Sequence, residues 1–222
     1  MNGNEYWLAK LKEKGFWFVD IPRTASSSIR AELGKEYGPL YGKENLIEQV
    51  YRTKQVFQDH IPASHMKRIL GTALWDKLYT FAFVRNPWER MVSFYYYRIR
   101  KGHFGNELSF RDYVLRLRDF YAGQSCELFT YHGFYLSCSD YILDAFGNNL
   151  VSFVGKYENR AEDLDKIAGK LGFRNIGKLW IQKSAEHQGH YSSPYDDETA
   201  EIIRNIFSRD ILLFDYKFEK SS

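Results

Sequence analysis

The chain has 222 residues, of which 44% are hydrophobic and 27% are charged, and its formal net charge at pH 7 is +3. This composition is typical of a globular protein and excludes a disordered or collagen-like chain. So small a charge gives no indication of nucleic-acid binding, and two cysteines are too few for a disulfide framework, but the balance is compatible with an anionic ligand.

Apolar runs and helical patterns alternate along the sequence. Three apolar runs are expected to form strands, at residues 16–21, 78–84 and 150–156. A helical pattern follows each of them, at residues 26–33, 88–99 and 160–172. The first two runs are apolar almost throughout, as in strands that are covered on both faces. The alternation predicts an α/β fold: a single three-layer domain over residues 1–222, with a central, mainly parallel sheet flanked by helices.

The later helices carry signals at their ends. Asn159 is expected to cap the third helix, with Glu162 as its capping-box partner and Gly172 as its end. A last helix is expected to begin near Asp196, because apolar residues recur at helical spacing from there. The closing segment, residues 211–218, is expected to form a short strand or an extended tail.

A hydroxyl-rich loop, Pro22 to Ser28, joins the first expected strand to its helix. The start of a helix binds anions, because it presents unpaired backbone N–H groups and the positive end of the helix dipole. Seryl and threonyl hydroxyls and the Arg23 guanidinium would add donors. The loop lacks the glycines and the lysine of an ATP-type P-loop, which disfavours an ordinary magnesium-dependent kinase. The alternative is a serine-capped helix start with solvated hydroxyls.

A second basic segment follows the second expected strand. Arg85 comes directly after the strand, and Ser93 lies about two helical turns into the next helix. A guanidinium and a hydroxyl in this arrangement can hold one further phosphate. The alternative for Arg85 is an ion pair with Glu89. Three other arginines of this helix are expected on its solvated face: Arg90, Arg98 and Arg100.

These segments resemble the sulfotransferases that use 3′-phosphoadenosine 5′-phosphosulfate (PAPS), in the branch that includes carbohydrate sulfotransferases. Four stretches carry the resemblance in order: IPRTASSSI, FVRNPWERMVSFYY, FVGKYENRAEDLDKI and YDDETAEIIRNIFSRDILLFDYKFE. They span residues 15–219, and the second is the most specific. The chain departs from the family pattern at Arg23, where lysine is usual, and at Ala25 and Ser26, where glycines are common.

The resemblance implies a P-loop-like sulfotransferase fold and a PAPS-dependent enzyme. Such an enzyme moves a sulfuryl group to a hydroxyl of a glycan or small-molecule acceptor, releases adenosine 3′,5′-bisphosphate and needs no metal. The resemblance assigns the 5′-phosphosulfate to the loop residues Arg23, Thr24, Ala25, Ser26, Ser27 and Ser28. It assigns the 3′-phosphate to Arg85 and Ser93, and it suggests that a later loop with Lys183 and Ser184 closes over the nucleotide. Arg23 would also stabilise charge on the bridging oxygen as the S–O bond breaks.

Transfer to a hydroxyl requires a base, and histidine or a carboxylate is the natural choice. His60 and His65 lie shortly before the second expected strand. The resemblance favours His60 as the catalytic base over His65, and Asp59 is a poorer candidate. The alternative is that both histidines cap a helix over residues 63–70.

Two other functions fit the same residues. One is a magnesium-dependent P-loop phosphotransferase, and the other is a non-catalytic nucleotide-binding module of the same fold. The acceptor is not indicated: Trp88, Tyr95 to Tyr97 and the region 131–135 could stack on a sugar or an aromatic ring, or could simply form core. The sequence does not indicate an oligomeric state.

The location of the protein is predicted only from general features. No apolar run approaches the roughly 18 residues of a membrane helix, and the polar beginning of the sequence has no signal-peptide core. We therefore expect a cytoplasmic protein with neither a membrane nor a nucleic acid as its partner.

Overall fold

The structure is a computed structural model that describes residues 3–37, 60–103, 108–124, 129, 135–172 and 189–221. The chain forms two compact units. We call Met1–Val84 with Asp140–Ile181 the sheet unit, and Arg85–Ser139 with Gln182–Ser222 the helical unit. Each is described by itself below, and the expectation of one domain over residues 1–222 stays a prediction.

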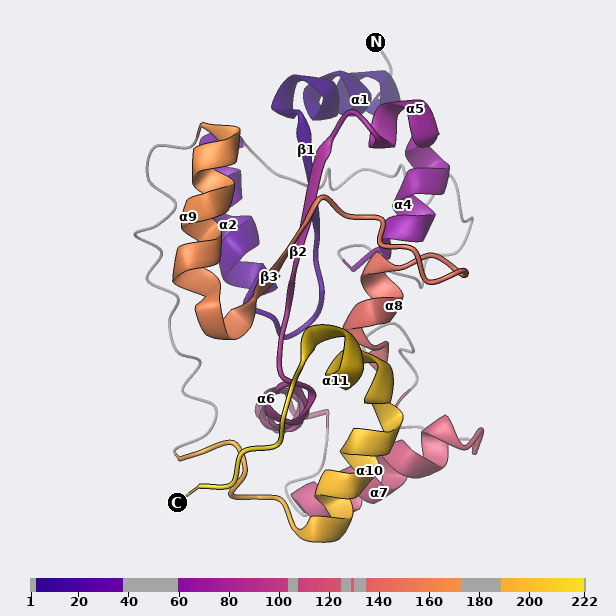
Figure 1. The fold of residues 1–222 in the computed structure, drawn as a ribbon, viewed down its shortest axis with the longest axis vertical. Helices are drawn as coiled ribbons and strands as arrows, with labels where there is room; N and C mark the ends of the chain where they lie inside the picture. Colours follow the sequence, from indigo (N-terminus) through magenta and orange to yellow (C-terminus); the bar gives the residue numbers. More distant parts are fainter. Residues whose placement is uncertain are drawn as a thin grey trace. The chain divides into compact units, whose positions relative to one another are not determined.

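A parallel three-stranded sheet organises the sheet unit, as predicted (Figure 1). Its strands are β1 (Phe16–Val19), β2 (Tyr79–Val84) and β3 (Phe153–Lys156). The strand order is β1-β2-β3, so β2 lies in the centre, and all of its residues after Tyr79 are buried. In register, Ala82 of β2 pairs with Val19 of β1 and with Val154 of β3. The strands are shorter than the apolar runs, because residues 20 and 21 already leave β1 for the loop.

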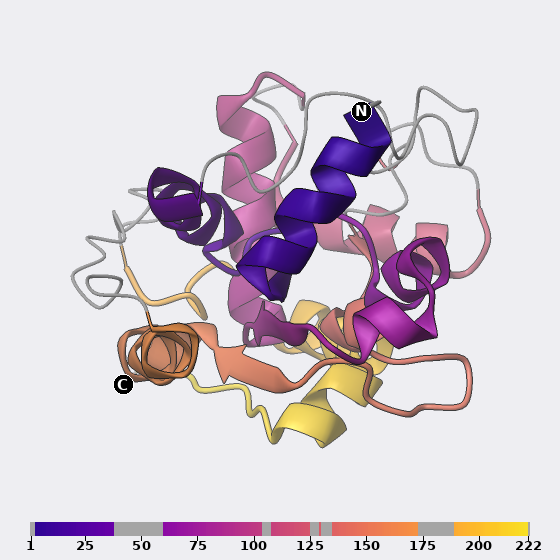
Figure 2. The same cartoon turned by 90° about the horizontal axis from the view of Figure 1, so that it is seen from above.

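Helices flank this sheet (Figures 1 and 2). The helices of the unit are α1 (Gly3–Lys14), α2 (Ser26–Tyr37), α4 (Ala63–Leu70), α5 (Thr72–Trp75) and α9 (Arg160–Leu171). The figures show α2 and α9 on one side of the sheet and α4 on the other. Alternate residues of β1 and β2 form the buried core with α2 and α9: Phe16, Phe18, Ile29, Leu33, Phe81, Phe83, Leu164, Ile167 and Ala168. The prediction of a mixed α/β fold is therefore confirmed, and its three-layer, P-loop-like detail stays a prediction.

The start of α9 differs from the prediction. Asn159 belongs to a short 3-10 turn and makes no side-chain capping hydrogen bond. Asp163 instead accepts a hydrogen bond from the backbone N–H of Lys156 at 2.8 Å and forms an ion pair with Lys166 at 2.7 Å. A carboxylate in the first turn of α9 thus accepts a hydrogen bond from the backbone just before the helix. The predicted end is confirmed, since Gly172 has the left-handed conformation with φ of 73°.

The helical unit is built around aromatic side chains. Its main helices are α6 (Pro87–Arg100), α7 (Phe110–Tyr121), α10 (Asp197–Ile206) and α11 (Ser208–Phe214), and α8 (Cys138–Ile142) begins in it. The fully buried Trp88 donates its indole N–H to the Ala200 carbonyl at 2.9 Å. Residues 211–218 were predicted as a strand or tail, but α11 continues to Phe214, and the Ile211 N–H donates to the Phe207 carbonyl as in a helix. Only the chain after α11 is non-helical, from Asp215 to Ser221.

Buried Asp210 ties α11 to the start of α8. Its two carboxylate oxygens accept the backbone N–H groups of Cys138 at 2.6 Å and Ser139 at 2.8 Å. Burial raises the pKa of Asp210, and the hydrogen bonds from Ser139 and the charge of Arg90 oppose that shift. The same burial raises the pKa of the Cys138 thiol to about 12, so this cysteine is a neutral core side chain at physiological pH.

Arg90 corrects the prediction of a solvated arginine face on α6. This side chain is 1% exposed, donates to the Leu136 carbonyl at 2.9 Å and lies over the Phe94 ring at 5.5 Å. Arg98 is half-buried, and only Arg100 is exposed as predicted. The pattern of arginines along the helix could not reveal Arg90's partners, because the Leu136 carbonyl comes from a distant segment.

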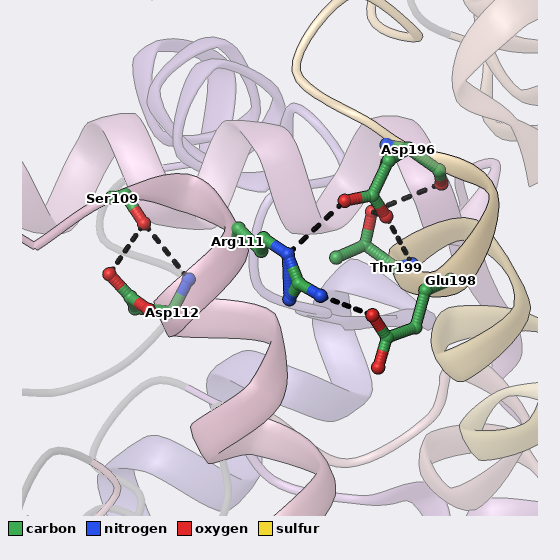
Figure 3. A network of polar contacts seen from close by, with 6 residues as sticks. All are labelled: Ser109, Arg111, Asp112, Asp196, Glu198 and Thr199. Atoms are coloured by element: carbon green, nitrogen blue, oxygen red, sulfur yellow. Dashed lines mark hydrogen bonds and ion pairs between the residues drawn. The ribbon is translucent and has the colours of Figure 1, made fainter.

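Exposed polar groups join α7 to α10 (Figure 3). Asp196 caps α10, as predicted for its start, and forms a capping box with Thr199. Arg111 of α7 reaches the Asp196 carboxylate at 3.4 Å and also pairs with Glu198. Ser109 caps α7 in the same view. These ion pairs are solvent-exposed, so each contributes only about 0.2–1 kcal/mol.

A close contact between β3 and β2 generates a stability prediction. A Cβ atom added at Gly155 would lie 2.6 Å from Cε1 of Phe83, whose ring is fully buried. We expect Gly155→Ala to lower the free energy of unfolding by about 1–3 kcal/mol, as overpacked core substitutions do. Gly169→Ala, on the exposed face of α9 with open space around it, should instead raise it by about 1 kcal/mol. Urea denaturation measures the free energy of unfolding of both variants. Equal midpoints for the two would contradict the close contact between Gly155 and Phe83.

Candidate functional site

The loop between β1 and α2 has an unusual backbone. Arg23 and Ala25 both have φ of 67°, in the left-handed region that non-glycine residues rarely occupy, and Thr24 between them has a negative φ. Residues of alternating hand turn successive backbone N–H groups toward one concavity, which is a known arrangement for binding anions. The loop therefore adopts without glycine a shape that glycine usually supplies, at a cost of about 1–2 kcal/mol for each left-handed residue.

Hydrogen bonds inside the loop hold this shape. Thr24 is fully buried and donates its hydroxyl hydrogen to the Ile21 carbonyl at 2.9 Å. The N–H groups of Ser28 and Ile29 both donate to the Ala25 carbonyl, at 3.0 and 3.1 Å, so helical bonding begins at Ala25. The first N–H groups after Ala25, at the start of α2, have no acceptor within the helix. The hydroxyl hydrogen of Thr24 is used within the loop.

The side chains at the start of α2 suit a negatively charged ligand. The first turn of the helix contains no acidic residue. Ser26 is 3% exposed, Ser28 is half-buried and Ser27 is exposed, so the three hydroxyls point into different surroundings. Arg23 is half-exposed beside them. The helix dipole, the alternating backbone and the guanidinium thus all favour an anion at the same loop.

The ring of His60 contacts Asp20, so His60 lies close to the end of β1. Nδ1 of His60 is 3.0 Å from the Asp20 carbonyl oxygen and 2.9 Å from one carboxylate oxygen of the same residue. The alternative role as a helix cap does not hold, since α4 begins after Pro62 and makes no side-chain capping bond. Asp20, which contacts the His60 ring, lies only three residues before the left-handed Arg23.

His65 has different surroundings, in the first turns of α4. Burial lowers the pKa of His65, and the nearby positive charge of Arg68 lowers it further. A histidine with a lowered pKa is a weaker base. The role of either residue as a base stays a prediction.

Asp20 and Arg30 are site residues that the sequence analysis missed. The Asp20 side chain has no exposed surface, and its second carboxylate oxygen lies 3.2 Å from the Arg30 guanidinium of α2. Asp20 was expected to lie within the first strand, at residues 16–21. A carboxylate that directly follows an apolar strand is a signal that could have found it, since strand ends in parallel sheets carry binding groups.

Arg85 and Ser93 belong to the helical unit and are described within it. Arg85 is 7% exposed and donates to a Glu89 carboxylate oxygen at 2.9 Å, so the ion pair named as its alternative role is present. Ser93 is 4% exposed on α6. Asn86, between the strand and α6, accepts the N–H of Trp88 and donates to the Lys217 carbonyl. Lys183 and Ser184 lie outside the described residues.

The aromatic side chains near α6 are mostly core. Trp88 is completely buried and Tyr135 is 1% exposed, so neither is available to stack on an acceptor. The Tyr95 hydroxyl donates to the Leu108 carbonyl, and its ring packs edge-on against Phe110 at 5.3 Å. Tyr131 lies outside the described residues.

Within the described part of the chain, no three His, Cys, Asp or Glu side chains gather in a way that could hold a metal ion. In the same residues, no helix is both long enough and apolar enough to cross a membrane.

Comparison with known proteins identifies the family to which this chain is similar. The model of a family described as the sulfotransferase family matches residues 11–217. An uncharacterized protein of Archaeoglobus fulgidus is 32% identical over 128 residues, which are 57% of this chain and 94% of that protein. No solved structure matches the chain at a significant level.

The strained backbone of the loop can be tested at Ala25. Ala25→Gly removes the methyl group that disfavours φ of 67° but also frees the unfolded chain, and the two effects oppose each other. We expect a net gain in unfolding free energy of about 0.5–1 kcal/mol, because the left-handed penalty exceeds the entropic term. Ala31→Gly, at an exposed position of α2, should lower the free energy of unfolding by about 1 kcal/mol. If chemical denaturation shows that both variants are less stable than the parent, the backbone strain at Ala25 is contradicted.

Proposed function

This chain belongs to the sulfotransferase family, and we propose that it transfers a sulfuryl group from PAPS to a hydroxyl group of a glycan or small-molecule acceptor. Adenosine 3′,5′-bisphosphate is the other product. The observation that carries the proposal is the loop before α2, where Arg23 and Ala25 alternate in hand with their neighbours. That backbone, together with a helix start free of acidic residues, suits a phosphosulfate group.

The proposal assigns the 5′-phosphosulfate to the loop, residues 23–28. Backbone N–H groups and the hydroxyls of Ser26, Ser27 and Ser28 would bind its oxygens, and Thr24 would contribute its backbone N–H. Arg23 lies in the loop itself, where a guanidinium can neutralise charge on the oxygen that bridges sulfur and phosphorus. The loop's residues therefore fit the donor on chemical grounds.

The 3′-phosphate is assigned to Arg85 and Ser93 from the family resemblance. Both are buried polar groups of the helical unit, and a buried guanidinium needs anionic partners. Glu89 supplies one such partner, and a phosphate could share the same guanidinium, which has five N–H donors. Lys183 and Ser184 remain assigned to the nucleotide by resemblance alone.

The residues of the sheet unit suggest how the reaction proceeds. The donor supplies an electrophilic sulfur atom and a phosphate leaving group. As the acceptor oxygen forms its bond to sulfur, His60 takes the hydroxyl proton on Nε2 and becomes an imidazolium. The electron pair of the breaking S–O bond goes to the bridging oxygen, and Arg23 stabilises the negative charge that grows there. Charge and protons balance without a metal ion in this scheme.

Nucleotide-dependent thermal shifts combined with a transfer assay test the function. Adenosine 3′,5′-bisphosphate should raise the melting temperature, because a ligand that binds only the folded state stabilises it, whereas ATP with Mg²⁺ should not. [³⁵S]PAPS should label at least one hydroxyl compound in a panel of desulfated glycans, simple sugars and phenols. Stabilisation by ATP with Mg²⁺ alone would indicate a phosphotransferase. Binding of the bisphosphate with no transfer, even to water, would indicate a non-catalytic module.

The 3′-phosphate assignment predicts a selective loss at Arg85. Losing a charge-assisted contact in a buried site costs about 2–5 kcal/mol, so Arg85→Ala should weaken adenosine 3′,5′-bisphosphate by about 10²-fold or more. Adenosine 5′-phosphosulfate, which has no 3′-phosphate, should bind the variant almost as well as the parent. Glu89→Ala is the matched control, because it removes the ion-pair partner and keeps the guanidinium. Calorimetric titration that finds both nucleotides equally weakened rejects the assignment.

The base assignment predicts a large loss of turnover at His60. His60→Asn keeps an N–H donor near the position of Nδ1 and removes the nitrogen that would accept a proton. Turnover of [³⁵S]PAPS should fall by about 10²–10⁴-fold, the usual contribution of a general base, while the bisphosphate still binds. His65→Asn, in α4, is the control and should stay active. An active His60→Asn with an inactive His65→Asn would transfer the role to His65.

A further inference from the structure

We infer that Asp20 is the positioning residue of the base: it holds His60 in one tautomer and stabilises the imidazolium that forms during transfer. The inference rests on the proposed function, in which His60 accepts the acceptor's proton. It concerns three residues of the sheet unit that the sequence separates widely: Asp20 after β1, Arg30 on α2 and His60 before α4.

The contact with Asp20 determines which tautomer His60 adopts. Nδ1 of His60 lies 3.0 Å from the backbone carbonyl oxygen of Asp20, in hydrogen-bond geometry. A carbonyl oxygen only accepts hydrogen bonds, so Nδ1 must carry the hydrogen. A neutral imidazole has one N–H, and Nε2 therefore keeps its lone pair. The contact with Asp20 thus leaves Nε2 as the nitrogen that can take a proton.

Asp20 also acts on His60 through its charge. One carboxylate oxygen lies 2.9 Å from the same Nδ1 of His60, and the side chain has no exposed surface. A buried carboxylate beside a histidine favours the protonated ring, because opposite charges attract strongly away from water. Asp20 would therefore stabilise His60 after it has accepted the proton, which is the state that the reaction creates.

An ion pair with Arg30 explains how the protein tolerates a buried carboxylate while His60 is neutral. Arg30 of α2 lies 3.2 Å from the other carboxylate oxygen and supplies a permanent positive charge. Among the described residues, none gives either carboxylate oxygen a hydrogen bond of standard geometry, so charge and proximity hold the group. Buried polar groups of this kind are rare in native proteins and are kept mainly where function needs them.

Nuclear magnetic resonance tests the tautomer without any turnover. Long-range ¹H–¹⁵N spectra of protein labelled with [¹⁵N]histidine distinguish the two neutral forms, and His60→Asn identifies the His60 signals by their absence. Above the titration of the ring we expect His60 to carry its hydrogen on Nδ1. A hydrogen on Nε2 overturns the inference, whatever the enzyme activity proves to be. This readout also survives if the proposed function fails.

Kinetics of Asp20→Asn test the charge. The amide preserves the shape but no longer stabilises the imidazolium, so turnover of PAPS should fall by about 10- to 100-fold, as for other partners that orient a reacting group. The bisphosphate should bind unchanged.

Asp163→Asn is the matched control, since Asp163 is another buried carboxylate of the sheet unit and pairs with Lys156 and Lys166. It should reduce stability and leave turnover unchanged. If Asp20→Asn and Asp163→Asn behave alike, Asp20 is merely structural and the inference fails. If the parent protein binds the bisphosphate but transfers sulfuryl to nothing, the proposed function fails, and the tautomer of His60 still decides the positioning role.

Discussion

A negative charge that water cannot reach is the constraint around which the sheet unit's site is arranged. Asp20 leaves β1 with its side chain fully buried, so it needs positive or hydrogen-donating partners close by. Arg30 answers from α2 and His60 from the segment before α4. One residue therefore contacts both a helix and the segment that carries the histidine.

The elements of the fold were predictable where they depend on local pattern, and the site was predictable only in part. The apolar runs of β1 and β2 predicted a parallel sheet because strands buried on both faces need no polar side. Partners that are distant in sequence were invisible. Nothing in the pattern of α6 shows that the Leu136 carbonyl draws Arg90 inside, and nothing links Asp20 to a histidine 40 positions later.

Errors at element ends have the same physical origin. Asn159 is a good capping residue, but Asp163 makes the hydrogen bond to Lys156, because the preceding turn points the chain toward it. The segment after α10 has an apolar pattern that suits a strand as well as a helix. Asp210 decides in favour of α11, since its carboxylate must reach the start of α8. Tertiary contacts thus settle what local propensity leaves open.

The loop that carries Arg23 and Ala25 shows what a chain gains when it builds a left-handed turn from residues with side chains. A glycine loop samples many conformations, and each ligand that it binds must freeze them at an entropic cost. Side chains remove most of those conformations in advance, so the strain is borne once, during folding. In the proposed function, the donor would meet a loop that is already ordered, and the free energy of contact would be expressed as affinity rather than spent on ordering the backbone.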